Sequence, residues 1–545
     1  MQTKIIPPTP GAYTYPLLIK NLLTTPLIYA PDQKIIYRDL KEFTYRQFGK
    51  RVCQLAHGLT KLGVKAGDTV AVMDWDSHRY LECYFAVPML GAILHTVNIR
   101  LSSEQLLYTI NHAEDDVLLI NSEFLPMLAA IKDQLATVKK IVLLSDTSEA
   151  EAAGLDHEYE RMLQENPEEY DFPDFDENSI ATTFYTTGTT GLPKGVYFSH
   201  RQLVLHTYGI LSALCTFDRQ ARLSADDVYM PMTPMFHVHA WGMPYLMTLL
   251  CSKQVYPGRY EPKTLLDLVT KHKVTFSHCV PTILHMLLSH PAIAGCDLSG
   301  WKVIIGGSAL SKGMCKQALA HGINVFTGYG MSETCPVLTI ASLKADMYQW
   351  NEDSQIAIRC RTGLPISNVK LEIVDPNGRP VVHDGKATGE VVVRAPWLTQ
   401  GYFKDEEKSK ELWEGGWLHT GDIGYIDEEG YLQITDRLKD VIKTGGEWIS
   451  SLALEDIISQ HPGVSEVAVI GVRDAKWGER PMALVVPKAG GTPVDVEDIR
   501  ATILREVEKG ALPKYGMPEK ILLVDQIAKT SVGKINKKQL RRDFT

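Results

Sequence analysis

The segment TTGTTGLPKG, residues 186–195, begins with six residues that are all threonine or glycine. Glycine lets backbone N–H groups approach a ligand closely and threonine hydroxyl groups add donors, so this composition suits a phosphate-rich anion. Apolar, strand-like runs flank the segment at 180–185 and 196–198. We therefore predict a hairpin that holds a phosphate-binding loop, and a flexible surface loop is the simpler alternative.

Three familiar motifs of nucleotide and acyl chemistry do not match this chain. Lys194 precedes a glycine instead of following one, so the segment is not the P-loop pattern G-x-x-x-x-G-K-[ST]. Gly328 and Gly330 are followed by Glu333 where the dinucleotide fingerprint G-x-G-x-x-G needs its third glycine. Leu310 stands where the hydrolase elbow G-x-S-x-G needs its second glycine. The sequence disfavours all three classes.

Length and composition narrow the class of protein. A chain of 545 residues is too long for one core, so we expect two or more domains. The formal net charge of −9 provides no basic face for nucleic acid. Nine cysteines without a C-x-x-C pair argue against a disulfide framework or a zinc cluster. The start MQTKIIPPTPGAY lacks the features of a signal peptide, so we expect a cytoplasmic protein without a transmembrane segment.

The pattern along the chain predicts an α/β fold. Strand-like runs alternate with helical patterns, as in parallel α/β layers, at 70–74, 117–120, 140–145, 302–307 and 324–330. From about residue 360, closely spaced strands separated by turns predict a small antiparallel β-barrel. A smaller α+β unit begins near Asp436. We predict an N-terminal domain at 1–435, a hinge linker at 436–441 and a mobile C-terminal domain at 442–545.

Further motifs carry a resemblance to a known family. In order after the opening loop come YGMSET (329–334), TGD (420–422), DRLKD (436–440) and KTSVGKI (529–535). The chain resembles the adenylate-forming enzymes, a superfamily of acyl-CoA synthetases, nonribosomal peptide adenylation domains and beetle luciferases. The stretches PMFHVHAW (234–241) and KTGGEWISS (443–451) are most similar to the fatty-acyl-CoA synthetase branch. His239 departs from the asparagine that many such enzymes carry.

The resemblance implies a two-step reaction. A carboxylate attacks the α-phosphate of ATP to give acyl-AMP and pyrophosphate, and the thiol of coenzyme A then attacks the acyl-adenylate. Neither step needs an enzyme nucleophile, so catalysis consists of aligning anions and stabilising charge on phosphoryl oxygens. ATP, Mg²⁺, coenzyme A and a small carboxylic acid are the implied cofactor and substrates.

The resemblance also implies the residues that bind nucleotide and metal. Those expected at the β- and γ-phosphates are Thr186, Thr187, Gly188, Thr189, Thr190, Gly191 and Lys194. Those expected around AMP are Gly307, Ser308, Ala309, Tyr329, Gly330, Met331, Ser332, Thr334, Asp422 and Arg437. Glu333 is expected to bind Mg²⁺ together with Thr187, because a hard cation prefers oxygen ligands. Taken alone, Glu333 could be a solvated surface residue and Asp422 a turn former.

The acyl pocket is expected around residues 237–241. His237 is expected near the substrate carboxylate, and a zinc site with His239 is disfavoured because no third ligand is present. Trp241 is either a gate to the acyl tunnel or a core residue. Gly330 stands where acetate-activating relatives carry tryptophan, so we expect it to leave the pocket open to longer acids.

The C-terminal domain is expected to contribute to both steps. Lys534 is expected to be the catalytic lysine that bridges carboxylate and α-phosphate, and the simpler alternative is a lysine on a solvated basic helix. Lys439 is the expected pivot of a domain rotation. Residues expected to line the coenzyme A tunnel after that rotation are Gly445, Gly446, Glu447 and Trp448.

The sequence leaves the identity of the carboxylic acid substrate open. We expect a medium- or long-chain fatty acid, and a cyclic, aromatic or methylthio-alkanoic acid is the alternative. A luciferase-like oxygenase, an adenylation domain that feeds a carrier protein and a non-catalytic acyl-nucleotide binding protein are further alternatives. A homodimer is expected only from the resemblance to dimeric relatives.

Overall fold

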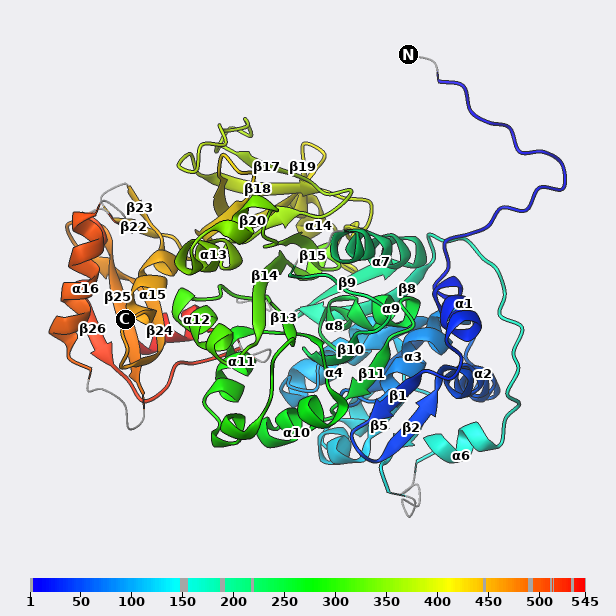
Figure 1. Ribbon diagram of the computed structural model, residues 1–545. Helices are drawn as coiled ribbons and strands as arrows, with labels where there is room; N and C mark the ends of the chain where they lie inside the picture. The colour runs from blue at the N-terminus through cyan, green and yellow to red at the C-terminus, as the bar shows by residue number, and fades with distance from the viewer. Residues whose placement is uncertain are drawn as a thin grey trace.

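The computed structural model describes residues 3–147, 155–186, 192–216, 220–444, 447–488, 494–509, 512, 514–530 and 534–544. In Figure 1 the chain forms two α/β layers, an antiparallel sheet above them and a C-terminal unit beside them. The α-helices are α1 (Lys20–Tyr29), α2 (Tyr45–Lys61), α3 (His78–Met89), α4 (Ser103–Ala113), α5 (Leu125–Ala129), α6 (Tyr159–Gln164), α7 (His200–Cys215), α8 (Val238–Trp241), α9 (Met243–Leu249), α10 (Pro262–His272), α11 (Pro281–Leu288), α12 (Lys312–Ala320), α13 (Glu352–Arg359), α14 (Glu406–Leu412), α15 (Ser451–Ser459), α16 (Val496–Glu508) and α17 (Lys537–Phe544).

A nine-stranded sheet forms the first layer. Its spatial order is β16 (Leu364–Pro365), β15 (Val337–Ile340), β14 (Asn324–Gly330), β13 (Lys302–Ile305), β12 (Phe276–Cys279), β10 (Val228–Met232), β11 (Lys253–Tyr256), β1 (Lys34–Tyr37) and β2 (Lys41–Thr44). The neighbours from β14 to β1 pair in parallel. The predicted strands at 302–307 and 324–330 are therefore confirmed as central, parallel strands.

A seven-stranded sheet forms the second layer. Its order is β7 (His157–Glu158), β6 (Lys140–Leu144), β5 (Asp115–Asn121), β3 (Thr69–Met73), β4 (Ile93–Thr96), β8 (Ile180–Thr186) and β9 (Lys194–Ser199). The strand β3 is buried along its whole length, as expected of a parallel strand covered on both faces. The last two strands pair antiparallel, with Thr186 opposite Lys194, so the predicted hairpin is confirmed.

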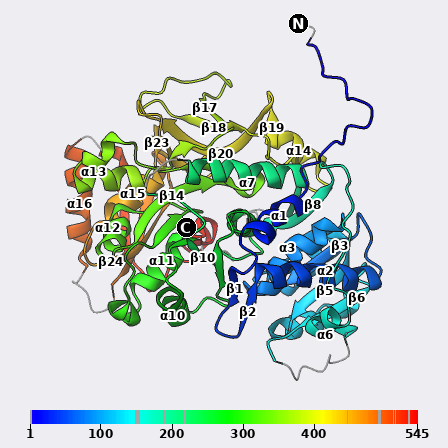
Figure 2. The ribbon, with the colours of Figure 1, turned by 45° about the vertical axis from the view of Figure 1, so that its right-hand side comes forward.

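Local signals fix the helices that cover these layers. The helix α7 follows β9 directly, and the side chains and backbone N–H groups of Ser199 and Gln202 form a capping box at its start. Thr44 and Gln47 begin α2 in the same way. Figure 2 shows α7 between the upper antiparallel sheet and the α/β layers. The phosphate-loop hairpin is thus anchored by a well-capped helix.

The antiparallel sheet contains β17 (Lys370–Val374), β18 (Gly389–Arg394), β20 (Trp417–Ile426) and β19 (Trp413–Glu414), with β21 (Leu432–Arg437) paired to β20. It confirms the predicted small antiparallel unit. The C-terminal sheet contains β23 (Glu447–Ile449), β22 (Ile442–Thr444), β25 (Gly478–Pro487) and β24 (Val464–Asp474), with β26 (Lys520–Leu523) paired to β25. It has its own apolar core between the sheet and helices α15 and α16.

A short segment of the chain connects the antiparallel sheet to the C-terminal sheet. Asp436 and Arg437, predicted as part of the linker, complete β21 and pair with Ile423 and Asp422 of β20. Only 438–441, which include Lys439, separate β21 from β22. Among the helices in the described ranges, none is long and apolar enough to cross a membrane.

Candidate active site

Three adjacent strand ends form the floor of the site. The strands β12, β13 and β14 lie side by side and in parallel, so the segments that follow them meet at one edge of the sheet. Carboxyl ends of parallel strands are where α/β folds bind ligands. The predicted residues Gly307, Ser308 and Ala309 lie one residue after the end of β13 and are exposed. They are therefore accessible at the place where a nucleotide is expected.

Tyr329, Asp422 and Arg437 come together although they lie far apart in the sequence. The hydroxyl group of Tyr329 donates a hydrogen bond to Oδ2 of Asp422 over 2.7 Å. The Nε atom of Arg437, from the paired strand, lies 3.5 Å from Oδ1 of Asp422. Burial raises the pKa of Asp422, and Arg437 and the Tyr329 hydrogen bond oppose that shift. The arrangement fixes one carboxylate beside an aromatic ring, which suits recognition of a nucleoside.

Lys534 reaches this group from the C-terminal domain. Its Cε atom lies 3.0 Å, and its Nζ atom 3.7 Å, from where a Cβ atom on Gly307 would be. Burial, and then the charge of Arg437, lower the pKa of Lys534 to about 8, although Asp422 and Glu333 favour its charged form. The residue precedes α17 and faces the N-terminal domain, so it is not part of a solvated basic helix.

Glu333 is buried at the end of β14, with 7% of its surface exposed. Its Oε1 atom accepts a hydrogen bond of 2.7 Å from the hydroxyl group of Tyr402. The Nζ atom of Lys194 lies 4.3 Å from the centre of the same tyrosine ring. The sequence alone did not indicate Tyr402, because the segment GYF at 401–403 belongs to none of the motifs that carry the family resemblance.

The donor chemistry at Glu333 fits a magnesium ion. Within the described ranges, no group of three or more histidine, cysteine, aspartate or glutamate side chains could hold a metal. Magnesium is commonly bound by one or two carboxylates together with substrate phosphates and water, so a single glutamate suffices. Thr187, the second expected ligand, lies outside the described residues.

Several other predicted residues also lie outside the described part of the chain. These are Gly188, Thr189, Thr190, Gly191, Gly445 and Gly446. Glu447 and Trp448 belong to β23, where only the backbone is described. Their expected roles at the phosphates and at coenzyme A stay predictions.

The segment from Val238 to Gly242, which includes the short element α8, forms a left-handed turn and not a regular right-handed helix. The φ angles are +49°, +53°, +46°, +60° and +73° in order, and only the last residue is glycine. Left-handed conformations cost about 1–2 kcal/mol for each residue that carries a Cβ atom, and such strain gathers at functional sites. The turn separates His237 from Trp241 and directs them to different surroundings.

His237 is neutral in this environment. Burial, and then the positive charges of Lys534 and Arg100, lower its pKa to about 3. A neutral imidazole close to that lysine can donate a hydrogen bond without adding a competing charge. His239 is fully buried among the rings of Phe184, Phe198 and Tyr84, and neither of its ring nitrogens has a hydrogen-bond partner in the described structure.

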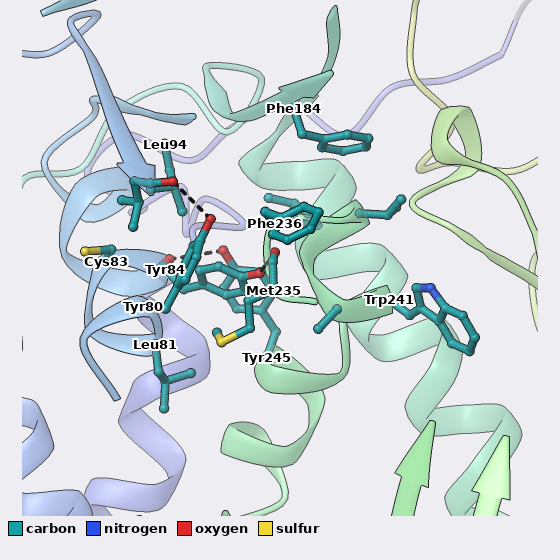
Figure 3. Packing of buried hydrophobic residues seen from close by; sticks show 14 of the residues in the cluster. Tyr80, Leu81, Cys83, Tyr84, Leu94, Phe184, Met235, Phe236, Trp241 and Tyr245 are labelled. Atoms are coloured by element: carbon teal, nitrogen blue, oxygen red, sulfur yellow. Dashed lines mark hydrogen bonds between the residues drawn. The ribbon is translucent and has the colours of Figure 1, made fainter. Parts of the chain in front are cut away.

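Trp241 lies between an apolar cluster and the ends of strands β12 and β13. Figure 3 shows its ring at the edge of the cluster that contains Tyr84, Phe236 and Tyr245. The indole packs on His278 at 5.0 Å, and its Cη2 atom is 2.8 Å from where a Cβ atom on Gly306 would be. The residue is 6% exposed, so in this conformation it is packed like a core residue at the position expected of a gate.

Gly330 lies where neighbouring backbone leaves no room for a side chain. A Cβ atom there would lie 1.8 Å from the carbonyl oxygen of Pro336, because β14 and β15 pair antiparallel with a register shift at this residue. Backbone occupies the direction that a side chain at Gly330 would take, and the expectation that this glycine leaves the acyl pocket open to longer acids stays a prediction. The hydroxyl group of Thr334 bonds the backbone of Met331 and Pro336, so it closes the loop that also contains the half-buried Ser332.

Comparison with known proteins agrees with this geometry. The family model described as AMP-binding enzyme matches residues 29–403. The chain belongs to the AMP-binding enzyme family. A second model, AMP-binding enzyme C-terminal domain, matches residues 453–534 of this AMP-binding enzyme.

Two relatives and one solved structure are similar over almost the whole chain. A long-chain-fatty-acid–CoA ligase of Thermus thermophilus is 41% identical, covering 92% of this chain and 90% of the relative. A 3-methylmercaptopropionyl-CoA ligase of Ruegeria lacuscaerulensis is 37% identical over 97% of this chain and 98% of the relative. The structure of ATP-bound MatB from Rhodopseudomonas palustris superposes with a TM-score of 0.81 at 26% identity, covering 96% of this chain and 98% of that chain. Together the comparisons support an ATP-dependent, AMP-forming acid–CoA ligase.

Proposed function

We propose that this AMP-binding enzyme activates a medium- or long-chain fatty acid to acyl-AMP with release of pyrophosphate, and then transfers the acyl group to the thiol of coenzyme A with release of AMP. The observation that carries the proposal is the position of Lys534 against Gly307, beside the Tyr329–Asp422–Arg437 group. The 41% identity to a long-chain-fatty-acid–CoA ligase supports a fatty acid as the substrate.

In the proposed first step the enzyme aligns two anions. Asp422 accepts hydrogen bonds from the ribose hydroxyl groups, which places the α-phosphate near Lys534. The ammonium group of Lys534 stabilises the negative charge that develops on the α-phosphate oxygens as the carboxylate attacks. Lys194, after the loop, binds the departing pyrophosphate.

Magnesium is proposed at Glu333, where it would neutralise charge on the phosphate oxygens of bound ATP. The protein's part is to hold the Glu333 carboxylate in place through Tyr402. His237 is proposed beside the carboxylate of the acid, because it is neutral and near Lys534.

In the proposed second step the C-terminal domain rotates about residues 438–441, with Lys439 as the pivot. Lys534 leaves the site and the β22–β23 turn enters it to line the path of coenzyme A. Only this short segment joins the two sheets, which supports a hinge at that point.

A methylthio-alkanoic acid is the second candidate substrate. It is favoured by the 37% identity to a 3-methylmercaptopropionyl-CoA ligase, whose similarity spans nearly both chains. A series of saturated acids from two to sixteen carbons, with 3-methylthiopropionate alongside, distinguishes the two candidates.

The test measures pyrophosphate and AMP for each acid, with and without coenzyme A. Each buried methylene should add about 0.8 kcal/mol of binding until the tunnel ends, so kcat/KM should rise over several carbons beyond acetate. A preference for acetate, or for 3-methylthiopropionate over every fatty acid, contradicts a fatty-acid substrate. No pyrophosphate release with any acid contradicts the enzymatic function and favours a non-catalytic binding protein.

A further inference from the structure

Tyr402 contacts two side chains of opposite charge in the candidate site, those of Glu333 and Lys194. The hydroxyl group of Tyr402 donates to Oε1 of Glu333 over 2.7 Å. The Nζ atom of Lys194 lies over the ring of Tyr402, 4.3 Å from its centre. In the described part of the chain, no ion pair of 4.0 Å or less joins Lys194 to Glu333. One side chain therefore contacts both groups while they remain apart.

The backbone around Tyr402 is tied to both neighbours. The N–H group of Phe403 donates to the carbonyl oxygen of Gly195 over 2.8 Å, and Tyr402 forms a β-bridge with Val196. The N–H group of Thr399 donates to the carbonyl oxygen of Glu333 over 3.0 Å. These bonds fix the position of Tyr402 relative to β9 on one side and to the end of β14 on the other.

Lys194 and Glu333 carry opposite charges that act on each other. Burial lowers the pKa of Lys194, and the charge of Glu333 is among the groups that raise it. A direct ion pair in this half-buried region would occupy the carboxylate oxygen and the ammonium group together. Neither would then be available to a cation or to a phosphate without first breaking that pair.

Tyr402 can prevent this collapse through two different parts of its side chain. A phenol O–H bonded to one carboxylate oxygen leaves the second oxygen oriented and available. The negative face of the ring attracts an ammonium group without supplying an anion that would compete with phosphate.

We propose that Tyr402 is a positioning residue of the metal and phosphate site, which holds Glu333 through its hydroxyl group and Lys194 through its ring. The proposal rests on the proposed function of those two residues. It predicts separable effects, because the hydroxyl group serves the metal ligand and the ring serves the phosphate ligand.

Two substitutions separate the two contacts. Tyr402→Phe removes the hydroxyl group and keeps the ring, so the affinity for Mg²⁺·ATP should fall about tenfold while the affinity for ATP in excess EDTA stays within twofold. Tyr402→Leu removes both, so the affinity for metal-free ATP should also fall about tenfold. Titration calorimetry measures both affinities without turnover. If Tyr402→Leu does not fold, Tyr402→Met provides the same comparison.

Tyr425, in β20, offers a matched control. Its hydroxyl group accepts a hydrogen bond of 2.5 Å from Arg361, and the same guanidinium group lies 5.6 Å from its ring centre. Tyr425→Phe therefore loses a hydroxyl hydrogen bond whose partner is neither Lys194 nor Glu333. Both nucleotide affinities should stay at the wild-type value in this variant.

A double-mutant cycle tests the link to the metal ligand. Once Glu333→Gln has removed the carboxylate, adding Tyr402→Phe should change Mg²⁺·ATP affinity by less than about twofold, because the two act as one unit. Full additivity of the two substitutions overturns the proposal. So does an unchanged Mg²⁺·ATP affinity in Tyr402→Phe, or an equal loss in Tyr425→Phe.

Failure of the proposed function gives a different result. In that case the fatty-acid series releases no pyrophosphate, whereas the binding titrations still report the effect of Tyr402 on nucleotide and metal. The two hypotheses are thus tested by separate measurements.

Discussion

Lys534→Ala removes a cation that the C-terminal domain places against Gly307, just after β13. The Nζ atom lies 3.7 Å from where a Cβ atom on Gly307 would be, next to Asp422 and Arg437. Losing one preorganised electrostatic contact to a developing oxyanion costs about 10²–10³ in rate, or about 2.7–4 kcal/mol. We expect the rate of acyl-adenylate formation to fall by that factor. Thioester formation from supplied acyl-adenylate should change by less than about twofold, because the lysine has then left the site.

The depressed pKa of Lys534 adds a signature in the pH profile. With a pKa of about 8, roughly nine-tenths of the lysine is protonated at pH 7 and roughly one-tenth at pH 9. The adenylation rate should therefore decline as the pH rises through 8. Lys534→Arg stays charged throughout this range, so its rate should be lower at pH 7 but should lose the decline near pH 8.

Single-turnover measurements of the two half-reactions provide the assay. A lysine on a solvated surface predicts little change in either step, and a purely structural role predicts that both fall together with the melting temperature. Either result refutes the assignment of Lys534. A decline near pH 8 that persists in Lys534→Arg refutes its link to this lysine.

Three further substitutions test other parts of the site. Asp422→Asn should raise the KM for ATP about tenfold with little change in the KM for the acid, because it replaces a charged acceptor by a neutral amide; equal changes in both constants contradict a role at the nucleotide. Gly330→Ala should lower the free energy of unfolding in urea by about 3 kcal/mol, since its Cβ atom would meet the Pro336 carbonyl oxygen at 1.8 Å, whereas Gly295→Ala, which meets nothing within 4 Å, should be nearly neutral. Lys439→Pro should slow overall thioester formation more than adenylation, because a fixed φ angle hinders the rotation; equal loss of both steps with an unchanged fold argues against the pivot.

The strands and motifs were predictable because each depends on residues that are close in sequence. Apolar runs such as 70–74 and 302–307 correspond to β3 and β13, since a strand buried on both faces needs a continuous apolar run. The hairpin around the opening segment follows in the same way from its flanking strands. Local patterns also placed the small antiparallel unit and the C-terminal α+β unit.

The residue at which the linker begins could not be located from the sequence pattern alone. The charged run after Thr435 indicated a hinge from Asp436 onward, yet Asp436 is 2% exposed and lies within β21, which ends at Arg437. Its carboxylate accepts hydrogen bonds from the N–H and hydroxyl groups of Ser451, at the start of α15. A charged residue can be buried when a partner from elsewhere satisfies it, and the sequence does not name that partner.

The sequence by itself determined the order of the motifs, the type of each structural unit and the residue types available for phosphate, metal and nucleoside. Only the tertiary structure decided which of them meet. Tyr329 and Asp422 are 93 residues apart, and Glu333 and Tyr402 are 69 apart, yet each pair shares a hydrogen bond of 2.7 Å. The tertiary structure also decided that Gly330 is required by a neighbouring carbonyl group and that residues 238–242 turn in the left-handed sense. The physical reason is that periodicity reports which face of an element is buried, whereas contacts depend on how separate elements pack against each other.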